Sequence, residues 1–352
     1  MLEVNRNPNI EVMAYSEVTK VDGFVGSFKV HVTKKPRYVL DDVCNSCGAC
    51  VDVCPIFLPN EFNFGFSPKK AIDILFPQAV PAVYTIEEEN CVRCYACVDS
   101  CEVHAIDFSQ EPKEIELDVG TIIVCPGWDM FESDRYGYGK YWNVINQIQL
   151  ERILSANGPT EGHLLRPSDN KVPKKILMIN CVGARSEKEG EHTYCPGVCC
   201  LVTIKNAQLI LSEYPDAEII VSYRDIRTPG KNYEEYYRRA REKGIIFLKG
   251  MVGDIEEDPI TKNLICYVED EGSGQSLEYE ADLVVLSAVP EPSKGIDQIA
   301  NIMKLERTPE GFLREFHNRL DPIRTKVPGV FIAGFAQAPK PVDMTVNQGK
   351  GA

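Results

Sequence analysis

The sequence predicts an α/β protein that carries a separate, smaller cysteine-rich module, and three observations support this prediction. Short apolar runs typical of buried strands alternate with helical stretches over most of the chain after residue 110. Residues 39–110 differ from the rest, because they hold eight clustered cysteines and 11 acidic residues against three basic ones. The whole chain has 352 residues, 44% of them hydrophobic, and is therefore long enough for more than one buried core.

Each predicted element follows from its own residue pattern. Residues 9–34 alternate apolar and polar side chains, so we expect a small antiparallel meander with a turn at Asp22–Gly23. Further strands are expected at 115–118, 122–124, 174–180, 217–222, 245–248, 282–286 and 329–334, and a hairpin over 264–268 and 276–279. Helices are expected over 200–213 and 233–243, and Gly244 ends the second one. Strands that alternate with helices favour a parallel sheet.

Charge and composition exclude several classes of protein. There are 38 basic and 52 acidic residues, and the net charge of −14 disfavours nucleic acid or an anionic membrane surface as a partner. No apolar run reaches the roughly 18–20 residues of a spanning helix, and residues 1–30 carry no signal-peptide pattern. We therefore expect a soluble, unsecreted protein without membrane insertion.

Two of the three dense cysteine groups have the spacing C-x2-C-x2-C-x3-C, which is typical of a ferredoxin with two 4Fe–4S clusters. In that arrangement, three thiolates on one tight loop bind one cluster and the fourth cysteine reaches across to the other. The spacing assigns Cys44, Cys47, Cys50 and Cys101 to one cluster, and Cys91, Cys94, Cys97 and Cys54 to the other. Zinc sites use C-x2-C pairs, and disulfides between cysteines this close would be strained, so both alternatives fit less well.

The third cysteine group has the unusual spacing C-x13-C-x3-C-C and consists of Cys181, Cys195, Cys199 and Cys200. It follows a buried strand and precedes a helix, where a nucleotide-binding domain would place G-x-G-x-x-G, and no such glycine pattern is present. From these residues alone, a cluster is about as well supported as a zinc site and a redox dithiol together. The two remaining cysteines, Cys125 and Cys266, are expected in the core.

The combination of motifs resembles the HdrA-like family, the flavin- and iron–sulfur-containing subunits of heterodisulfide reductase. The segments that carry the resemblance are 11–39, 158–160, 179–183 with the third cysteine group, 223–227 and 334–341. The resemblance implies a thioredoxin-reductase-like two-domain flavoprotein core with an inserted α+β, bacterial-type 2(4Fe–4S) ferredoxin module. The implied domains are an FAD-binding domain in three pieces (1–38, 111–170 and 291–352), the ferredoxin module (39–110) and a second Rossmann-like domain (171–290).

The resemblance also implies FAD, and a third, non-standard 4Fe–4S cluster at Cys181, Cys195, Cys199 and Cys200. The expected FAD contacts are Gly127, Gly334, Phe335, Ala336 and Lys205. Lys205 either approaches the flavin ring and stabilises its reduced, anionic form, or is an ordinary solvated helix lysine. Members of the family open with a strand and G-x-G-x-x-G, and longer ones end in a second ferredoxin module. Since this sequence has neither, we expect a fragment or one half of a split subunit.

The function implied by the resemblance is electron relay between FAD and 4Fe–4S clusters in a cytoplasmic heterodisulfide-reductase-like complex. The implied partners are B- and C-type subunits, an electron-donating hydrogenase or dehydrogenase subunit, and ferredoxin. Flavin-based electron bifurcation would send one electron to a heterodisulfide and the other to ferredoxin. The alternatives are a self-contained NAD(P)H-dependent oxidoreductase acting on a sulfur or disulfide substrate, which the missing G-x-G-x-x-G disfavours, and a structural zinc scaffold.

Overall fold

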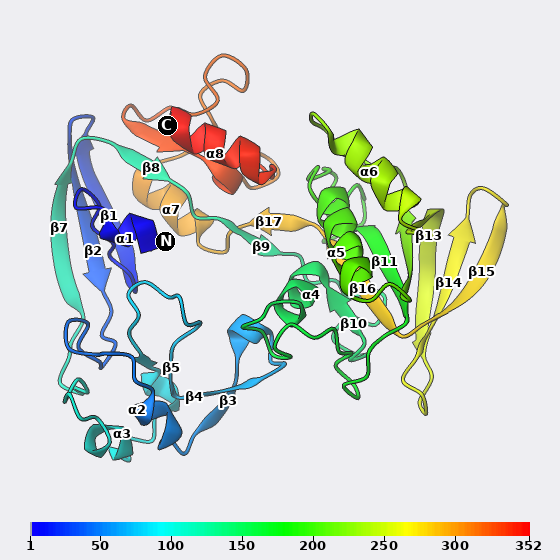
Figure 1. The fold of residues 1–352 in the computed structure, drawn as a ribbon. Helices are drawn as coiled ribbons and strands as arrows, with labels where there is room; N and C mark the ends of the chain where they lie inside the picture. The colour runs from blue at the N-terminus through cyan, green and yellow to red at the C-terminus, as the bar shows by residue number, and fades with distance from the viewer. Residues whose placement is uncertain (1) are drawn as a thin grey trace. The chain divides into compact units, whose positions relative to one another are not determined.

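The computed structural model describes residues 2–352, which form two compact units that divide between Thr121 and Ile122. Figure 1 shows the elements of both units along the chain. The first unit combines a small antiparallel sheet with the cysteine-rich module, and the second is built on a seven-stranded sheet.

The antiparallel sheet of the first unit has the order β1-β2-β7, with β1 (Ser16–Phe24), β2 (Ser27–Lys34) and β7 (Lys113–Val119). A short exposed helix, α1 (Leu2–Arg6), precedes it. The predicted turn at Asp22–Gly23 is wrong, because Gly23 pairs with Phe28 inside the hairpin and the chain reverses at Val25–Gly26. Gly26 adopts a left-handed φ of 86°, which suits the turn. Alternation along β2 buries Phe28, Val30 and Val32 on one face and thereby determines this register.

The cysteine-rich module contains only short elements, so its core is built around its cysteines. Its strands are β3 (Phe57–Pro59), β4 (Pro68–Lys70), β5 (Ile72–Asp73) and β6 (Thr85–Ile86), and its helices are α2 (Ala49–Asp52), α3 (Ala96–Asp99), η1 (Glu61–Asn63) and η2 (Glu88–Asn90). The buried residues Val39, Ile72 and Ile86 pack in one cluster with Cys50 and Cys97. The helices α2 and α3 have the same sequence, Ala-Cys-Val-Asp, and each follows one cysteine loop.

The large sheet of the second unit has the order β10-β16-β11-β12-β13-β14-β15. Its strands are β10 (Val144–Asn146), β11 (Lys175–Val182), β12 (Glu218–Tyr223), β13 (Ile246–Glu257), β14 (Leu264–Asp270), β15 (Gln275–Ala281) and β16 (Leu283–Ala288). The first five in spatial order are parallel, as predicted, and β13 to β15 form an antiparallel extension. The strand β13 is much longer than the expected 245–248, because its second half pairs with β14.

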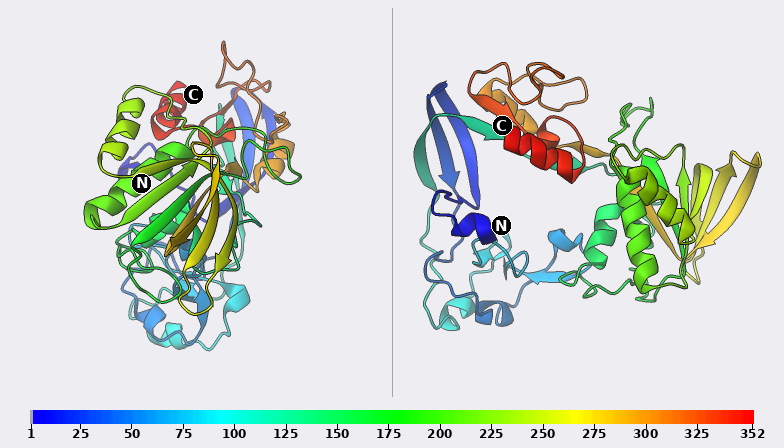
Figure 2. Two further views of the ribbon diagram at one scale, coloured as in Figure 1. Left: turned by 90° about the vertical axis from the view of Figure 1, so that its right-hand side faces the viewer. Right: turned by 45° about the horizontal axis from the view of Figure 1, so that its top comes forward.

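Three helices accompany this sheet: α4 (Gln147–Ile153), α5 (Cys199–Glu213) and α6 (Tyr233–Glu242), and the two views of Figure 2 show them from other directions. The helix α5 contacts β11 and β16 through buried residues that include Ile204, Ala207 and Ile210. The strand β10 and the helix α4 precede residue 171, where the second domain was expected to begin, yet β10 pairs with β16 at the edge of this sheet. The domain boundaries themselves stay a prediction.

The rest of the second unit consists of short ribbons and helices. The strands β8 (Ile122–Val124) and β18 (Val330–Ile332) pair in parallel, and β9 (Trp128–Met130) pairs with β17 (Pro290–Pro292). The helices are α7 (Ile296–Met303), η3 (Gly334–Ala336) and α8 (Val342–Gly351). Cys266 is buried as expected, but the expectation for Cys125 is wrong, because that thiol is exposed just after β8, a three-residue strand with a single partner.

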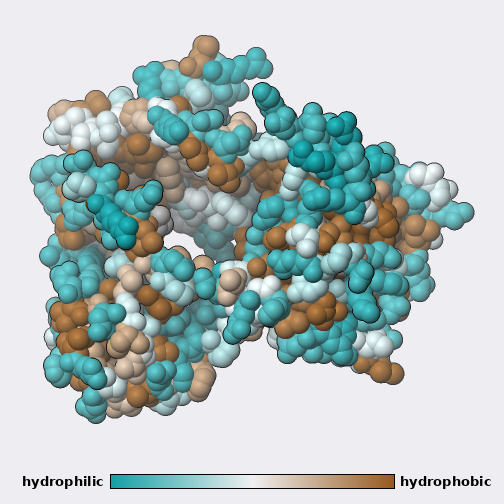
Figure 3. Space-filling model, viewed as in Figure 1, coloured by the Kyte–Doolittle hydropathy of each residue, from teal (hydrophilic) through white to brown (hydrophobic). Residues whose placement is uncertain are grey.

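The surface mixes hydrophilic and apolar residues over the face that Figure 3 shows. No helix among residues 2–352 combines the length and the hydropathy that crossing a bilayer requires.

Candidate functional site

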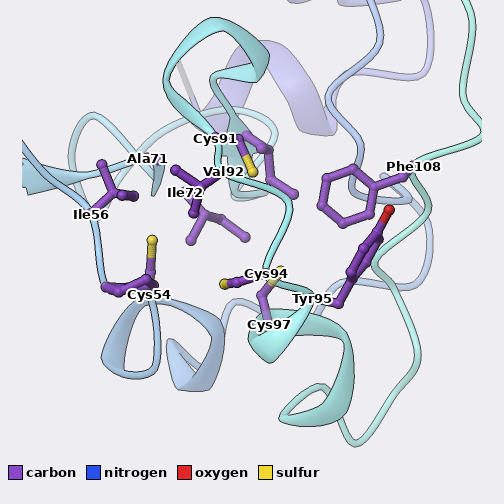
Figure 4. A pocket seen from close by; sticks show the side chains of 12 residues that line it. Cys54, Ile56, Ala71, Ile72, Cys91, Val92, Cys94, Tyr95, Cys97 and Phe108 are labelled. Carbon is purple, nitrogen blue, oxygen red and sulfur yellow. The ribbon is translucent and has the colours of Figure 1, made fainter.

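The two ferredoxin-type cysteine sets each line a cavity of their own. Cys44, Cys47, Cys50 and Cys101 surround one cavity together with Tyr84 and apolar residues such as Ile106. Cys91, Cys94, Cys97 and Cys54 line the other, where Figure 4 shows them around a space bordered by Ile72, Tyr95 and Phe108. The structure therefore brings together both ligand sets that the spacing assigned, including the fourth cysteine from the other loop.

Both cysteine loops have the same unusual backbone conformation. In the first loop, the residues on either side of Cys47 are left-handed, with φ of 61° at Ser46 and 89° at Gly48. In the second loop, the residues on either side of Cys94 are left-handed too, with φ of 51° at Arg93 and 63° at Tyr95. Three of these four residues are not glycine, so their conformation is strained. A strained conformation that recurs at matching positions of both motifs supports a common ligand geometry.

The donor set fits iron–sulfur clusters. Burial raises the pKa of the Cys50 thiol to about 12 and that of the Cys97 thiol to about 11, so each stays neutral unless a bound cation stabilises its thiolate. All 14 cysteines are free thiols, and no three His, Cys, Asp or Glu side chains in the described chain are close enough to share one metal ion. In a tetrahedral zinc site the sulfur ligands lie within about 4 Å of one another, because each Zn–S bond is about 2.3 Å long. The cysteines of each set are spread too widely for such a site. Each thiolate of a four-iron cluster instead binds a different iron.

The third cysteine group lies at the carboxyl edge of the parallel sheet. Cys181 is the second-last residue of β11 and has a left-handed φ of 62°, and Cys199 and Cys200 begin α5. The Cys199 thiol donates to the carbonyl of Ala288, the last residue of β16, at 3.6 Å. The Cys200 thiol donates to the Asp225 carbonyl beyond β12, at 4.0 Å. Parallel strands end at one edge, so residues far apart in sequence meet there.

The four thiols of this group are close enough to influence one another electrostatically. Burial is the largest cause that raises the pKa of Cys200, to about 11, and the nearby Cys181 and Cys195 raise it further. Burial also raises the pKa of Cys199, with Cys200, Cys181 and Cys195 adding to the effect. The structure therefore gathers Cys181, Cys195, Cys199 and Cys200 in one place. Their ligand role stays a prediction.

A buried polar network, which no local sequence pattern predicted, holds the start of α5 against the sheet. The Thr203 hydroxyl lies 2.7 Å from Asn180 Oδ1 on β11 and 2.7 Å from Ser287 Oγ on β16. Gln147 of α4 extends the network, since its amide nitrogen donates to Ser287 Oγ at 3.1 Å and its amide oxygen accepts from Asn206 at 2.7 Å. Because all these side chains are buried, the network positions the helix that carries Cys199 and Cys200.

A cavity of about 880 Å³ opens beside the third cysteine group, in the second unit. Its lining includes Cys199, Lys205 and Met130, and the aromatic pair Trp128 and Phe335, whose rings stack with centroids 5.4 Å apart. Two of the five expected FAD contacts, Lys205 and Phe335, line this cavity. The other three, Gly127, Gly334 and Ala336, do not, and Ala336 is completely buried.

Two lysines face the cavity with different partners. Lys205 is half exposed and forms an ion pair with Glu151. Lys340, which sequence reasoning missed, donates from Nζ to the carbonyl oxygens of Gly334 and Ala338. Burial lowers the pKa of Lys340 to about 8, and the charge of Glu315 acts in the opposite direction. No local sequence pattern predicts that Lys340 is buried, because the segments that enclose it are far apart in the sequence.

Comparison with known proteins agrees with these observations. The family model described as "4Fe-4S dicluster domain" matches residues 43–106. The A-type iron-sulfur subunit of CoB–CoM heterodisulfide reductase from Methanocaldococcus jannaschii is 50% identical over 356 residues, covering 100% of this chain and 54% of that protein. The A-type subunit of H(2)/formate:CoB-CoM heterodisulfide,ferredoxin reductase from Methanococcus maripaludis is 48% identical with the same coverage.

Among solved structures, thioredoxin reductase from Lactococcus lactis aligns with 80% of this chain and 82% of its own, with 16% identity and a TM-score of 0.43. A likeness of that strength supports nothing further. The α/β architecture and the 4Fe–4S dicluster module are confirmed. The chain spans about half the length of the curated relatives it matches. Over its own whole length it is similar to the A-type subunits of heterodisulfide reductase, in agreement with the resemblance that the combination of its motifs indicated.

Proposed function

We propose that this chain is the electron-transferring part of an iron–sulfur flavoprotein subunit, an oxidoreductase that relays electrons between FAD and three 4Fe–4S clusters. The proposal rests mainly on the observation that Cys199 of the third cysteine group lines the cavity of about 880 Å³ in the second unit. A redox cofactor in that cavity would therefore lie beside a cluster ligand, and a short separation favours electron transfer.

The lining of the cavity fits the flavin ring of FAD. Trp128, Met130 and Phe335 offer aromatic and apolar surface. Lys205 and Lys340 offer positive charge, although Glu151, the ion-pair partner of Lys205, and Asp343 line the cavity too. FAD, when bound, supplies one- and two-electron chemistry. The role of this chain would be to exclude water from the ring with the aromatic side chains and to stabilise negative charge on it with the two lysines.

The two ferredoxin-type sites support an electron relay rather than catalysis. Cys47 and Cys94 are exposed, while Cys50 and Cys97 are buried, so each predicted cluster would reach from the core of the module to its surface. Each cavity has a volume of only about 20 Å³, which leaves no room for a substrate beside the cysteines. We infer that electrons enter or leave the chain at this module.

The partners follow from the relatives' names. Those relatives are named as subunits of reductases of CoB–CoM heterodisulfide, some of them with H2, formate or ferredoxin in the name. We propose that this chain works in a similar complex, with B- and C-type subunits, an electron donor of the hydrogenase or dehydrogenase class, and ferredoxin. Flavin-based electron bifurcation, which sends one electron to a heterodisulfide and one to ferredoxin, is the finer form of this proposal.

The first test is a count of iron, acid-labile sulfide and flavin per chain, on protein purified without oxygen. We expect about twelve irons, four for each of three clusters, and one flavin. About eight irons would limit the chain to its ferredoxin pair, and zinc without visible absorbance would contradict the whole proposal. Fast flavin reduction by NADH or NADPH alone would instead favour the self-contained oxidoreductase.

A further inference from the structure

Two neighbouring loops bring three arginines to the third cysteine group. Arg185 lies in the loop after β11, and Arg224 and Arg227 lie in the loop after β12. The strands β11 and β12 are parallel neighbours, so both loops leave the sheet at the edge where the cysteines meet. The two loops are joined directly, because Arg224 Nη1 donates to the carbonyl oxygen of Arg185 at 2.8 Å.

The charges of these loops do not cancel. Asp225 forms an ion pair with Arg185 and a second one with Arg227, whose Nε lies 3.3 Å from Asp225 Oδ2. One carboxylate therefore serves two guanidinium groups, and Arg224 donates to a carbonyl. Three further carboxylates lie in the loop after β11. Glu187, which lines the adjoining cavity, and Glu189 are exposed, and Glu191 forms an ion pair with Arg135, whose Nη1 lies 3.5 Å from Glu191 Oε1. At the adjoining cavity, the three arginines therefore face the carboxylate of Asp225, which two of them share, and the solvated carboxylate of Glu187.

The positive charge reaches the thiols themselves. Arg185 and Arg227 line a cavity of about 270 Å³ together with Cys195. The Arg185 guanidinium lies within hydrogen-bonding reach of the Cys181 thiol, and the Arg227 guanidinium lies within the same reach of the Cys195 thiol. Each of these two cysteines therefore has a guanidinium group beside it.

The ferredoxin-type sites have the opposite environment. Residues 39–110 carry a net charge of −8, from 11 acidic residues against Lys69, Lys70 and Arg93. Arg93, next to the second cysteine loop, is already paired with Glu88, and Lys69 is paired with Glu61 and Glu87. Lys70, the third basic residue, donates from Nζ to the carbonyl oxygen of Cys54 at 2.6 Å, so one lysine rather than three arginines lies beside the ferredoxin-type cysteines.

We propose that Arg185, Arg224 and Arg227 are positioning residues that hold the reduction potential of the third cluster above the potentials of the ferredoxin pair. The proposal rests on the proposed function, which places a cluster at these cysteines. When that cluster accepts one electron from the reduced flavin, no bond forms or breaks and its negative charge grows by one unit. Fixed positive charge nearby favours the more negative state, and cluster potentials depend on such surroundings.

The test is a redox titration of the full chain, purified without oxygen and followed by electron paramagnetic resonance. The signal of the third cluster is identified as the one that Cys200→Ser removes. In Arg227→Gln, we expect its midpoint potential to fall while the two ferredoxin signals keep theirs. Arg227→Lys retains the charge and should restore most of the wild-type potential. Arg238→Gln, which removes an exposed arginine of α6, is the matched control and should leave all three potentials unchanged.

The outcomes separate this inference from the function on which it rests. A wild-type chain with about eight irons and no third signal would contradict the third cluster itself. About twelve irons with an unmoved third potential in Arg227→Gln would overturn the role of the arginines and leave the cluster intact. A fall of all three potentials by the same amount would overturn it too. Arg185→Gln repeats the test on the other loop, in case Arg227→Gln loses iron.

Discussion

The ferredoxin-type cysteines and the third cysteine group are positioned by different levels of structure. In the ferredoxin module, three ligands of each set lie within seven consecutive residues, and left-handed residues on both sides of the middle cysteine turn the loop inward. In the third group, Cys181 lies near the end of a strand, and Cys199 and Cys200 begin a helix. The thiols of Cys199 and Cys200 donate to one carbonyl at the end of a second strand and one beyond a third. A loop motif orients thiols locally, whereas a sheet edge orients them only after the sheet has formed.

This difference also explains why the ferredoxin-type cysteines and the third cysteine group have different charges around them. A loop of about twelve residues brings few neighbours with it, and the ferredoxin module stays acidic around its cysteines. The sheet edge collects side chains from every strand that ends there, including Arg185, Arg224 and Arg227. A cluster at the sheet edge can therefore be tuned by residues that no cysteine motif contains.

The largest expected effect is a loss of iron that tests whether the fourth cysteine of each loop binds the cluster of the other loop. Cys54→Ala and Cys91→Ala should each remove about four irons, and the double variant should remove no more, because both cysteines line the same cavity. The double variant of Cys54→Ala with Cys44→Ala should remove about eight. Iron and sulfide analysis distinguishes these results. The opposite pattern would mean that each loop keeps its own fourth cysteine.

The second-largest expected effect is a loss of iron from the third cysteine group. Cys200→Ser should lower the iron content from about twelve to about eight, because the buried Cys200 thiol stands among Cys181, Cys195 and Cys199. Cys125→Ser is the matched control, since it changes an exposed cysteine of the same unit outside every group. The same iron content in Cys200→Ser and in the wild type would contradict a cluster at the third cysteine group.

A smaller effect is expected where the sheet supports the third group. Thr203→Val removes the hydroxyl that contacts Asn180 and Ser287 and leaves buried polar groups without that partner, at a cost of about 1–3 kcal/mol. Thermal unfolding without oxygen should show a midpoint several degrees lower, and the signal of the third cluster should be lost before the ferredoxin signals. Ser212→Ala on the exposed side of α5 should change stability by less than about 0.5 kcal/mol. Simultaneous loss of all signals would show that the two regions unfold together.

The smallest effect is a pH dependence of stability at the large cavity. Burial lowers the pKa of Lys340 from 10.5 to about 8, so between these two pH values the unfolded chain binds more protons at this residue than the folded chain. Stability contributed by this lysine must therefore rise with pH across that window. The unfolding free energy of wild type minus that of Lys340→Met should increase from pH 8 to about 10.5. Lys350→Met, which removes an exposed lysine of α8, controls for net charge, and a flat difference for Lys340→Met would contradict its burial.

Local patterns in the sequence were sufficient for the main elements and for the ferredoxin cysteines. Apolar runs predicted β11, β12 and β16, helical periodicity predicted α5 and α6, and the repeated cysteine spacing predicted both ligand sets. These predictions succeeded because strand burial, helix amphipathicity and loop ligation depend on residues that are close together in the chain. The predicted hairpin turn was wrong by three residues, because register depends on which face of β2 is buried.

Only the tertiary structure decided what surrounds the third cysteine group. The buried network of Thr203, the cavity with Trp128, Phe335 and Lys340, and the three arginines all join residues tens of positions apart. Exposure of Cys125 was decided in the same way, since a strand with one partner covers its neighbours incompletely. The sequence determines which residues can bind iron, but the parallel sheet determines which charges and which cavity those residues meet, because it brings the ends of separate strands to one edge.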